Sequence, residues 1–252
     1  MRWTIGGYRR IVPPRSVTIP AGAVSLFDAR RGTTRAVEVQ AFEIAVTPAT
    51  VAGSRRPLTG ITWLEAIEAA NAAAEADGLQ PAYRCVDGRP WWDPRADGWR
   101  LPTEAEWVHA AAAGAATPTG AALRASAWTA DDGLDGPPPV AAKAANAFGV
   151  FDALGTVWEW VWDPIDPARY GDYRTLKGGG WADPAWSARI GTRRGSAPNA
   201  RIDDVGFRLA RGAVGGVDAD GAPWAQGWSA AEDARRAAIS GPLPVGWTPA
   251  LP

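Results

Sequence analysis

The sequence has almost no sulfur and almost no imidazole. Its 252 residues include one methionine, one cysteine, Cys85, and one histidine, His109. A single cysteine excludes an intrachain disulfide and a zinc site built from cysteines. A single histidine excludes an iron site with two histidines. We expect His109 inside a helix beside Trp107, where it would pack against its neighbours and not serve as the base of a Ser-His-Asp triad.

Charge of one sign and long hydrophobic runs are also lacking. The chain carries 26 basic and 27 acidic residues, which are interspersed and give a net charge of −1. No basic stripe suggests a nucleic-acid surface. No apolar run approaches the roughly 20 residues that a membrane span needs, and the first residues lack the apolar core of a signal peptide. We therefore expect no nucleic-acid or membrane partner and a cytoplasmic location.

Tryptophan, glycine and proline, in contrast, are abundant. There are 15 Trp, 29 Gly and 22 Pro, which predict many turns, few long helices and a core of indole rings whose N–H groups need partners. Polar and apolar residues alternate over residues 16–19 and 35–44, so each segment is predicted to be a strand. Residues 131–139 and 163–173 are rich in Gly, Pro and Asp and are expected to be loops.

Three segments contain a capping box, in which a Thr or Ser side chain and a Glu three residues later satisfy the first amides of a helix. A glycine follows each box at helical distance, where a helix commonly ends. The boxes begin at Thr62, Thr103 and Ser229, and the glycines are Gly78, Gly114 and Gly241. They predict helices over Thr62–Asp77 and Thr103–Ala113, and a third from Ser229 to Ile239.

The composition changes after Arg211, where Gly-Ala-Val-Gly-Gly-Val begins. We expect residues 1–211 to form the main domain and residues 212–252 to form a C-terminal extension with one short helix. Trp224, Trp228 and Trp247 suggest that the extension packs on the main domain. Two or three helices among many short strands predict a mixed α+β fold.

Four segments, in this order along the chain, carry a resemblance to a known family. They are Gly-Ile-Thr-Trp-Leu-Glu-Ala at 60–66, Gly-Trp-Arg-Leu-Pro-Thr-Glu-Ala-Glu-Trp at 98–107, Asn-Ala-Phe-Gly-Val-Phe-Asp-Ala-Leu-Gly-Thr-Val-Trp-Glu-Trp at 146–160, and Lys-Gly-Gly-Gly-Trp at 177–181 with Gly-Phe-Arg-Leu-Ala at 206–210. In these segments the chain resembles the formylglycine-generating, or sulfatase-modifying, enzyme family. The resemblance implies a C-type-lectin-like fold, with a small antiparallel sheet, two flanking helices and long loops that form an open surface.

The same segments can also be interpreted as folding determinants. Pro102 pre-sets the backbone before a capped helix. Trp158 and Trp160 would face one side of a strand, while Glu159 faces the other. A resemblance in fold does not by itself establish function.

The oxidase chemistry of that family requires residues that this chain lacks. The family uses two cysteines shortly after a Gly-Gly-Ser-Trp segment, and their thiolates bind copper, a metal that favours soft ligands. Asp183 and Ala188 stand at the matching positions here. Cys85 lies far away in the sequence, so one chain cannot supply two thiolates, and a two-thiolate site would need Cys85 from two chains. A sister branch, the sulfoxide synthases, uses an added helical bundle with three iron-binding histidines, which is also lacking. We therefore expect neither copper nor iron.

Calcium is the remaining cofactor that the resemblance implies. Oxygen donors suit this hard cation, and Asn146, Asp152 and Glu159 match the family motif that would supply them. Thr156 stands where the family usually has Asn, so one good carbonyl ligand is lost. Alternatively, Asn146 forms a turn and Glu159 is a charge on a strand face. We expect at most one weakened calcium site.

The loop from Trp181 to Asp204 corresponds to the surface where the family binds its substrate. Exposed Trp and Arg side chains dominate recognition in many interfaces. The candidate ligand-binding residues are Trp181, Trp186, Arg189, Arg193, Arg194, Asn199, Arg201 and Asp203. We expect Trp186, Arg189, Arg194 and Asn199 to share an open groove above Trp158 or Trp160. Alternatively, Trp181 lies in the core and the arginines pair with Asp183, Asp203 or Asp204.

Three functions stay open from the sequence. The first is a binding module, or pseudoenzyme, that takes a small molecule, a peptide or a protein on the loop surface. This class includes the hypervariable lectin-fold proteins, whose variable segment usually ends the chain, whereas residues 212–252 follow here. The second is a tailoring enzyme of altered, copper-independent chemistry, with Asp183 as its acid/base candidate unless Asp183-Pro184 is only a turn. The third is a structural partner domain.

Overall fold

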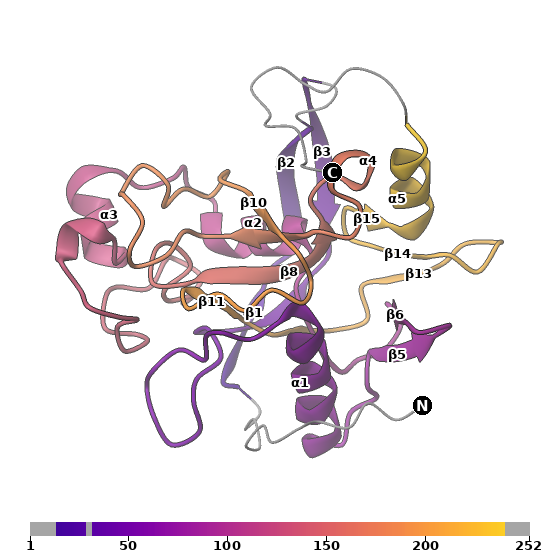
Figure 1. Cartoon of the computed structure of the whole chain (residues 1–252), viewed down its shortest axis with the longest axis horizontal. Helices are drawn as coiled ribbons and strands as arrows, with labels where there is room; N and C mark the ends of the chain where they lie inside the picture. The colour runs from indigo at the N-terminus through magenta and orange to yellow at the C-terminus, as the bar shows by residue number, and fades with distance from the viewer. Residues whose placement is uncertain (1–13, 29–31, 240–252) are drawn as a thin grey trace.

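Two four-stranded sheets form the centre of the molecule in the computed structural model, which describes residues 14–28 and 32–239 (Figure 1). The first sheet is antiparallel, in the order β1-β4-β12-β7. Its strands are β1 (Ser16–Ile19), β4 (Phe42–Ala45), β12 (Ala210–Arg211) and β7 (Trp99–Arg100). A strand from residues 210–211 therefore lies between strands that come much earlier in the sequence.

The second sheet has the order β10-β9-β8-β11. Its strands are β8 (Trp158–Pro164), β9 (Arg174–Lys177), β10 (Arg194–Ser196) and β11 (Val205–Phe207). β11 runs parallel to β8, whereas the other pairs are antiparallel. The sheet predicted from the family resemblance is thus accompanied by a second, mixed sheet.

Three smaller sheets surround these two. A long hairpin joins β2 (Gly22–Asp28) to β3 (Thr33–Val39), and a short one joins β5 (Tyr83–Val86) to β6 (Arg89–Trp92). The third comprises β13 (Gly215–Val217), β14 (Pro223–Ala225) and β15 (Trp228–Ser229). The sequence pattern did not predict this last sheet, because its strands are only two or three residues long.

Both central helices begin and end where their sequence signals predict. The first, α1, spans Trp63–Ala76 and the second, α2, spans Glu104–Ala112, and both capping boxes are formed. At α2, the Thr103 hydroxyl accepts the Glu106 amide at 3.2 Å, and the Glu106 carboxylate accepts the Thr103 amide at 2.9 Å. The two helix predictions are confirmed.

The other helical segments are short. α5 spans Ala230–Ala237 after the cap Ser229, so it ends before Ile239, and Gly241 lies outside the described residues. α3 (Gly120–Ser126) was not predicted, and neither was α4 (Pro167–Tyr170), which forms inside the expected loop 163–173. A one-turn 3-10 helix over Ala130–Asp132 begins the expected loop 131–139. None of the helices in the described part of the chain is long and apolar enough to cross a membrane.

The expected single strand over residues 35–44 is wrong. The segment is divided between β3 and β4, which belong to different sheets. The break lies at Gln40 and Ala41, where the Gln40 amide donates to the side chain of Gln226 from the C-terminal extension. Alternation of polar and apolar residues cannot reveal a break whose hydrogen-bond partner lies so far along the chain.

Indole rings fill the core, as the composition predicts, and many of them have a hydrogen-bond partner. Trp63 Nε1 donates to the Val161 carbonyl at 3.0 Å, and Trp160 Nε1 donates to the Ile61 carbonyl at the same distance. Trp107 Nε1 instead donates to a carboxylate, Glu159, at 2.8 Å. These bonds connect α1, α2 and β8 through the core.

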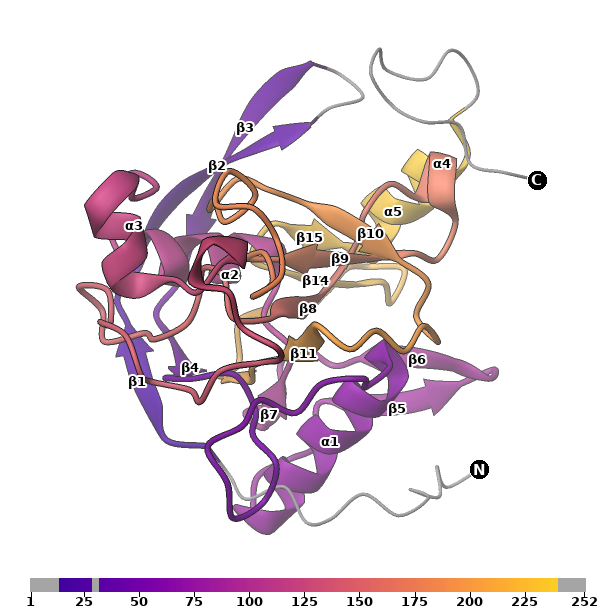
Figure 2. The ribbon, with the colours of Figure 1, turned by 60° about the vertical axis from the view of Figure 1, so that its left-hand side comes forward.

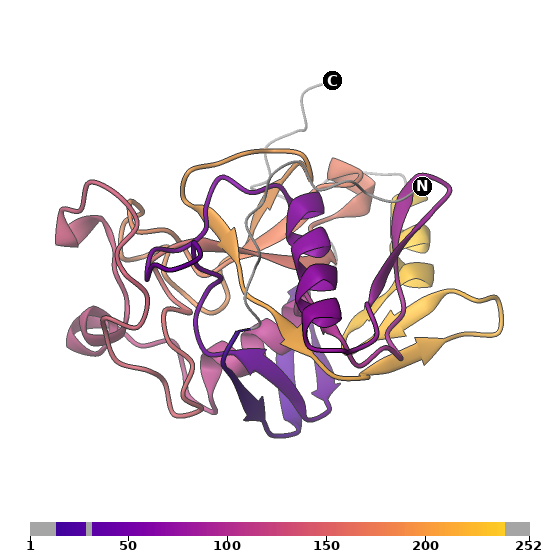
Figure 3. The ribbon, with the colours of Figure 1, turned by 90° about the horizontal axis from the view of Figure 1, so that it is seen from below.

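The C-terminal elements β13–β15 and α5 lie on the side of the molecule opposite α3, as Figures 2 and 3 show. Trp228 is 9% exposed, and its ring centroid is 5.4 Å from the rings of Trp92 and Trp162. Trp224 is 45% exposed. Trp247 lies outside the described residues.

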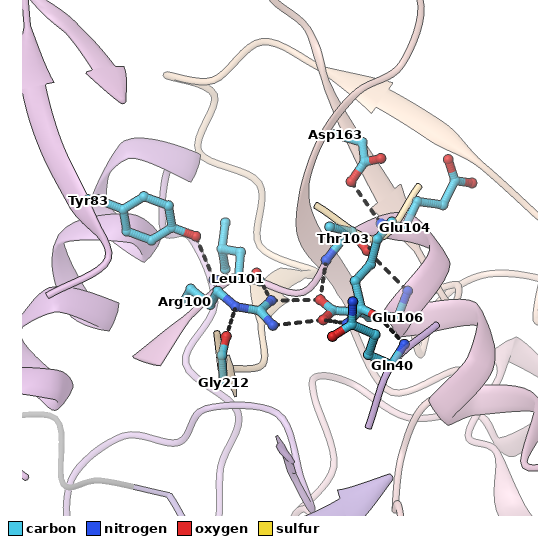
Figure 4. A network of polar contacts seen from close by, with 10 residues as sticks. Gln40, Tyr83, Arg100, Leu101, Thr103, Glu104, Glu106, Asp163 and Gly212 are labelled. Atoms are coloured by element: carbon cyan, nitrogen blue, oxygen red, sulfur yellow. Dashed lines mark hydrogen bonds and ion pairs between the residues drawn. The ribbon is translucent and has the colours of Figure 1, made fainter. Parts of the chain in front are cut away.

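A buried ion pair fixes the entrance to α2 (Figure 4). Arg100 on β7 forms two hydrogen bonds to the Glu106 carboxylate, at 2.6 and 2.7 Å, and both side chains are fully buried. Gln226 Nε2 donates to the same carboxylate at 2.5 Å. The capping glutamate of α2 therefore joins the first sheet to the C-terminal extension.

Candidate ligand-binding site

The two positions that the resemblance assigns to cysteines have structural roles here. Asp183 Oδ2 accepts hydrogen bonds from Trp158 Nε1 at 2.6 Å and from the Gly180 amide at 2.8 Å. Ala188 is buried in the core. A hydrogen-bonded turn and a buried methyl group therefore occupy the places where the family chemistry needs sulfur.

Asp204 is the second carboxylate at this turn. A Cβ atom placed on Gly180 would lie 2.8 Å from Asp204 Oδ2 and 3.4 Å from Asp183 Oδ2, so the glycine lets the backbone fit between the two acids. Burial, together with the charges of Asp183 and Asp203, raises the pKa of Asp204 even though Arg194 opposes the shift. Arg194 Nη1 lies 3.7 Å from Asp204 Oδ2, and its guanidinium is 5.6 Å from the centre of the Trp158 ring.

The other candidate residues of this loop lie in different environments. Trp186 is 68% exposed, and Arg189, Asn199 and Asp203 are exposed as well. Trp181 is partly buried, and its Nε1 has no hydrogen-bond partner among the described residues.

Two of the candidate arginines pair with glutamates at the start of helices. Arg201 binds Glu65 on α1 and also donates to the Gly60 carbonyl at 3.0 Å. Arg193 Nε lies 2.9 Å from Glu104 Oε1 on α2. Of the three aspartates considered as partners from the sequence, Asp204 is the one that pairs with an arginine of the described chain, Arg194.

A cavity of about 780 Å³ opens beside this loop. Its walls come from β2, from α2 and the residues that follow it, from the end of α4 and the turn after it, from β9 and from residues 190–195. Arg193 is the only candidate residue that lines it, and the four residues expected to share a groove do not. Arg194 is held instead over Trp158 and beside Asp204, the place where the expected groove would lie. The hollow is therefore beside the predicted surface and not above its tryptophans.

Three charged side chains meet at the cavity. Lys177 is 1% exposed, and its Nζ lies 3.3 Å from Glu104 Oε1, the oxygen that also faces Arg193. Burial alone would raise the pKa of Glu104, but the charges of Arg193 and Lys177 outweigh it and lower the pKa. Burial lowers the pKa of Lys177, and the charge of Glu104 opposes that shift. Two cations therefore share one carboxylate.

Asp163 lies beside Glu104 (Figure 4). Its Oδ2 accepts the backbone amide of Glu104 at 2.8 Å. Burial first, and then the charge of Glu104, raise the pKa of Asp163 to about 7. Near neutral pH this carboxyl therefore carries only part of a negative charge.

Lys177 and Glu104 were not identified as site residues from the sequence. Each lies inside a resemblance segment, where both were interpreted as parts of a folding motif. A capping box needs only its Glu at the third helical position, which is Glu106. Two features of the sequence could have indicated this site: the additional acid at Glu104, and Lys177 before three glycines. No local pattern connects them.

The proposed calcium donors are engaged within the protein. Asn146 Nδ2 donates to the Ala110 and Ala111 carbonyls at 2.7 and 3.2 Å, and its Oδ1 accepts the Phe148 and Val150 amides. Glu159 accepts two bonds from Arg208, at 2.6 and 2.7 Å.

Asp152 has one free oxygen. Its Oδ2 accepts the Ala141 amide at 2.6 Å, whereas Oδ1 is buried and has no partner in the part of the chain that the structure describes. Burial raises the pKa of this carboxyl. Within residues 14–28 and 32–239, no group of three or more His, Cys, Asp or Glu side chains is arranged to hold a metal ion. Calcium at Asn146, Asp152 and Glu159 would require their present bonds to open, and it stays a prediction.

Comparison with known proteins decides the family. The model of the Sulfatase-modifying factor enzyme 1-like domain matches residues 47–213. This chain belongs to that family. The resemblance found in the sequence and the α+β, C-type-lectin-like fold with several small sheets are thereby confirmed.

Individual curated proteins are similar over part or most of the chain. Inactive C-alpha-formylglycine-generating enzyme 2 of Bos taurus is 37% identical over 147 residues, which is 49% of this chain and 48% of that protein. The match thus spans about half the length of that relative. Chaperone protein LppX of Paenibacillus barcinonensis is 29% identical over 205 residues, or 65% of this chain and 72% of that protein.

Among solved structures, Treponema denticola variable protein 1 superimposes with a TM-score of 0.68 at 27% identity. The match covers 78% of this chain and 94% of that one. With Asp183 and Ala188 at the cysteine positions, this family member lacks the cysteine pair of the family's oxidase.

Proposed function

We propose that this family member is a non-oxidase binding module that takes its ligand at the loop surface formed by residues 181–204. The cavity that residues 190–195 help to line carries the proposal, because it combines apolar walls with a few convergent charged groups, as ligand sites commonly do. The loss of both sulfur donors supports it, and so does similarity to a protein described as an inactive formylglycine-generating enzyme. We also propose a cytoplasmic location, with no nucleic-acid or membrane partner.

A tailoring enzyme of altered, copper-independent chemistry is the second candidate, and one observation favours it. Asp204 has a raised pKa and lies beside Arg194 and Asp183 at the place of the lost cysteines. A carboxyl group with a raised pKa is suited to general acid/base work. Asp204 replaces Asp183 as the candidate, because Asp183 is held by Trp158 and Gly180.

Binding is tested by screening the purified chain against a library of anionic, neutral and cationic small molecules with ligand-observed NMR. Gly191→Trp would fill the cavity mouth, since Gly191 lines the cavity and has open space around its Cβ position. Gly136→Trp is the matched control, because Gly136 has similar open space and does not line the cavity. We expect hits that Gly191→Trp abolishes and Gly136→Trp retains. Hits that neither variant affects would contradict a site at this cavity.

The oxidase is tested separately, by incubating the chain with copper, oxygen and a cysteine-containing substrate peptide. We expect no change in peptide mass, because no two thiolates of one chain can hold the metal. Conversion of the cysteine to formylglycine would overturn the non-oxidase proposal.

A further inference from the structure

The walls of the cavity are mostly apolar and aromatic. Val108, Ile165 and Ile190 line it, together with Tyr170 and Tyr173. The two tyrosine rings are stacked, with centroids 5.8 Å apart and planes inclined by 17°. The volume of about 780 Å³ lies within the range of roughly 300–1,000 Å³ that small-molecule sites occupy. A ligand here would therefore bury an apolar or aromatic body.

The charged end of the cavity has an unused hydrogen-bonding capacity. An ammonium group has three donors, yet Glu104 is the only hydrogen-bond acceptor of Lys177 among the described residues, at 3.3 Å. A buried charge is costly unless its donors are satisfied. Lys177 is one of the residues that line the cavity, although only 1% of it is exposed, so a carboxylate at this end of the cavity would lie next to it.

The local charge balance favours an anion. Lys177 and Arg193 together carry two positive charges against the single charge of Glu104. Arg35 on β3 and Asp163 on β8 also act on Glu104, and these two have opposite signs. A cationic ligand would meet two fixed cations, whereas an anion would share them with Glu104.

We propose that this cavity binds a small organic acid, whose carboxylate accepts hydrogen bonds from Lys177 and Arg193 and whose apolar or aromatic body lies against Tyr170 and Tyr173. This inference rests on the proposed binding function and names its ligand class. The carboxylate supplies a second acceptor for Lys177, beside Glu104. The apolar body excludes water and so strengthens the charge-assisted bonds.

The experiment compares three probes of the same shape by isothermal titration calorimetry: 3-phenylpropionate, its amide and 3-phenylpropylamine. We expect the acid to bind at least tenfold more tightly than the amide and the amine not to bind. Lys177→Met should weaken binding of the acid at least tenfold and leave the affinity for the amide unchanged. Arg124→Gln, an exposed change on α3 outside the cavity, is the control and should alter none of the three.

If Lys177→Met does not fold, Arg193→Gln replaces it, since Arg193 is partly exposed at the same carboxylate. The comparison of the three probes needs no variant at all. Equal binding of acid and amide, tighter binding of the amine, or no binding of any probe would overturn the carboxylate inference. If the library then still yields hits that Gly191→Trp abolishes, the proposed function stands without this ligand class, and if it yields none, both fail.

Discussion

Glu159, a residue of the family motif, stabilises the fold through its pair with Arg208. The pair is buried and bidentate, and Glu159 also accepts the Trp107 indole. Removing one partner leaves an uncompensated buried charge, which costs about 3–5 kcal/mol. We therefore expect Arg208→Met to lower the free energy of unfolding by that amount, measured by urea denaturation.

Arg235→Met is the matched control, because Arg235 is 69% exposed and pairs with Glu232 on the surface of α5. Such pairs contribute about 0–1 kcal/mol. If the free energy of unfolding falls equally little in both variants, Glu159 is not the structural charge that its contacts indicate.

Asp163 should make stability depend on pH. Its pKa is raised to about 7 in the folded chain, from an ordinary value of 3.8. As the pH rises from about 4 to about 7, the unfolded chain loses this proton while the folded chain retains it, so stability falls across that window. Asp163→Asn should flatten the fall, and its advantage over the wild type should grow up to pH 7 and then stay constant.

The measurement is the urea midpoint at pH 5, 6, 7 and 8. Glu104, Asp233 and Arg35 also act on Asp163, and burial raises the pKa of Asp233 to about 6, so the variant keeps a smaller slope. Parallel curves for variant and wild type would show that Asp163 is not the group that titrates.

At the scale of elements, the capping threonines can be compared directly. Thr103 accepts the Glu106 amide, donates to the Gln226 carbonyl at 3.0 Å and is fully buried. Loss of an N-cap typically costs about 1 kcal/mol, and up to about 2 kcal/mol. We expect the stability lost in Thr103→Ala to lie at the upper end of that range and the loss in Thr62→Ala to lie near its middle, both measured by thermal unfolding.

Thr119 provides the control, because it precedes α3 without forming a side-chain cap. Thr119→Ala should change stability by less than about 0.5 kcal/mol. A loss equal to that of Thr103→Ala would mean that the hydroxyl bonds do not determine the effect.

The helices could be predicted because their signals are local. Thr62 and Thr103 each meet their partner three residues later, so the sequence contains the whole interaction. The break between β3 and β4 could not be predicted, because Gln226 supplies its hydrogen bond from the far end of the described chain. The alternation of polar and apolar residues over 35–44 indicates which side chains are buried, but it does not reveal which sheet each half of the segment joins.

The candidate site was only partly predictable for the same reason. The resemblance identified the loop from Trp181 to Asp204, and Arg193 does line the cavity. Lys177 and Glu104 are 73 positions apart in the sequence, and only the packing of α2 against β9 brings them together. Apolar walls from β2 and the turn after α4 leave no shared sequence pattern.

At the scale of the whole molecule, the C-terminal extension is part of the core. Trp228 packs against the rings of Trp92 and Trp162 and is 9% exposed. Truncating a buried Trp to Ala typically costs about 3–5 kcal/mol. We expect that loss for Trp228→Ala in urea denaturation, with one transition for the whole chain.

Trp224→Ala is the control in the same sheet, because Trp224 is 45% exposed and should lose far less. A separate early transition in the Trp228 variant would instead indicate that the extension unfolds as an independent unit.

The position of β12 has a consequence for synthesis on the ribosome. β12 lies between β4 and β7, and β11, only a few residues earlier, lies at the edge of the second sheet beside β8. A nascent chain that has reached residue 200 can form α1 and α2, but it leaves β4, β7 and β8 with unpaired edges. Unpaired edges promote aggregation, and long-range pairing slows folding. Both central sheets are complete only when β11 and β12 have been synthesised. Chains that terminate before residue 205 would therefore need a chaperone to cover these edges or a protease to degrade them.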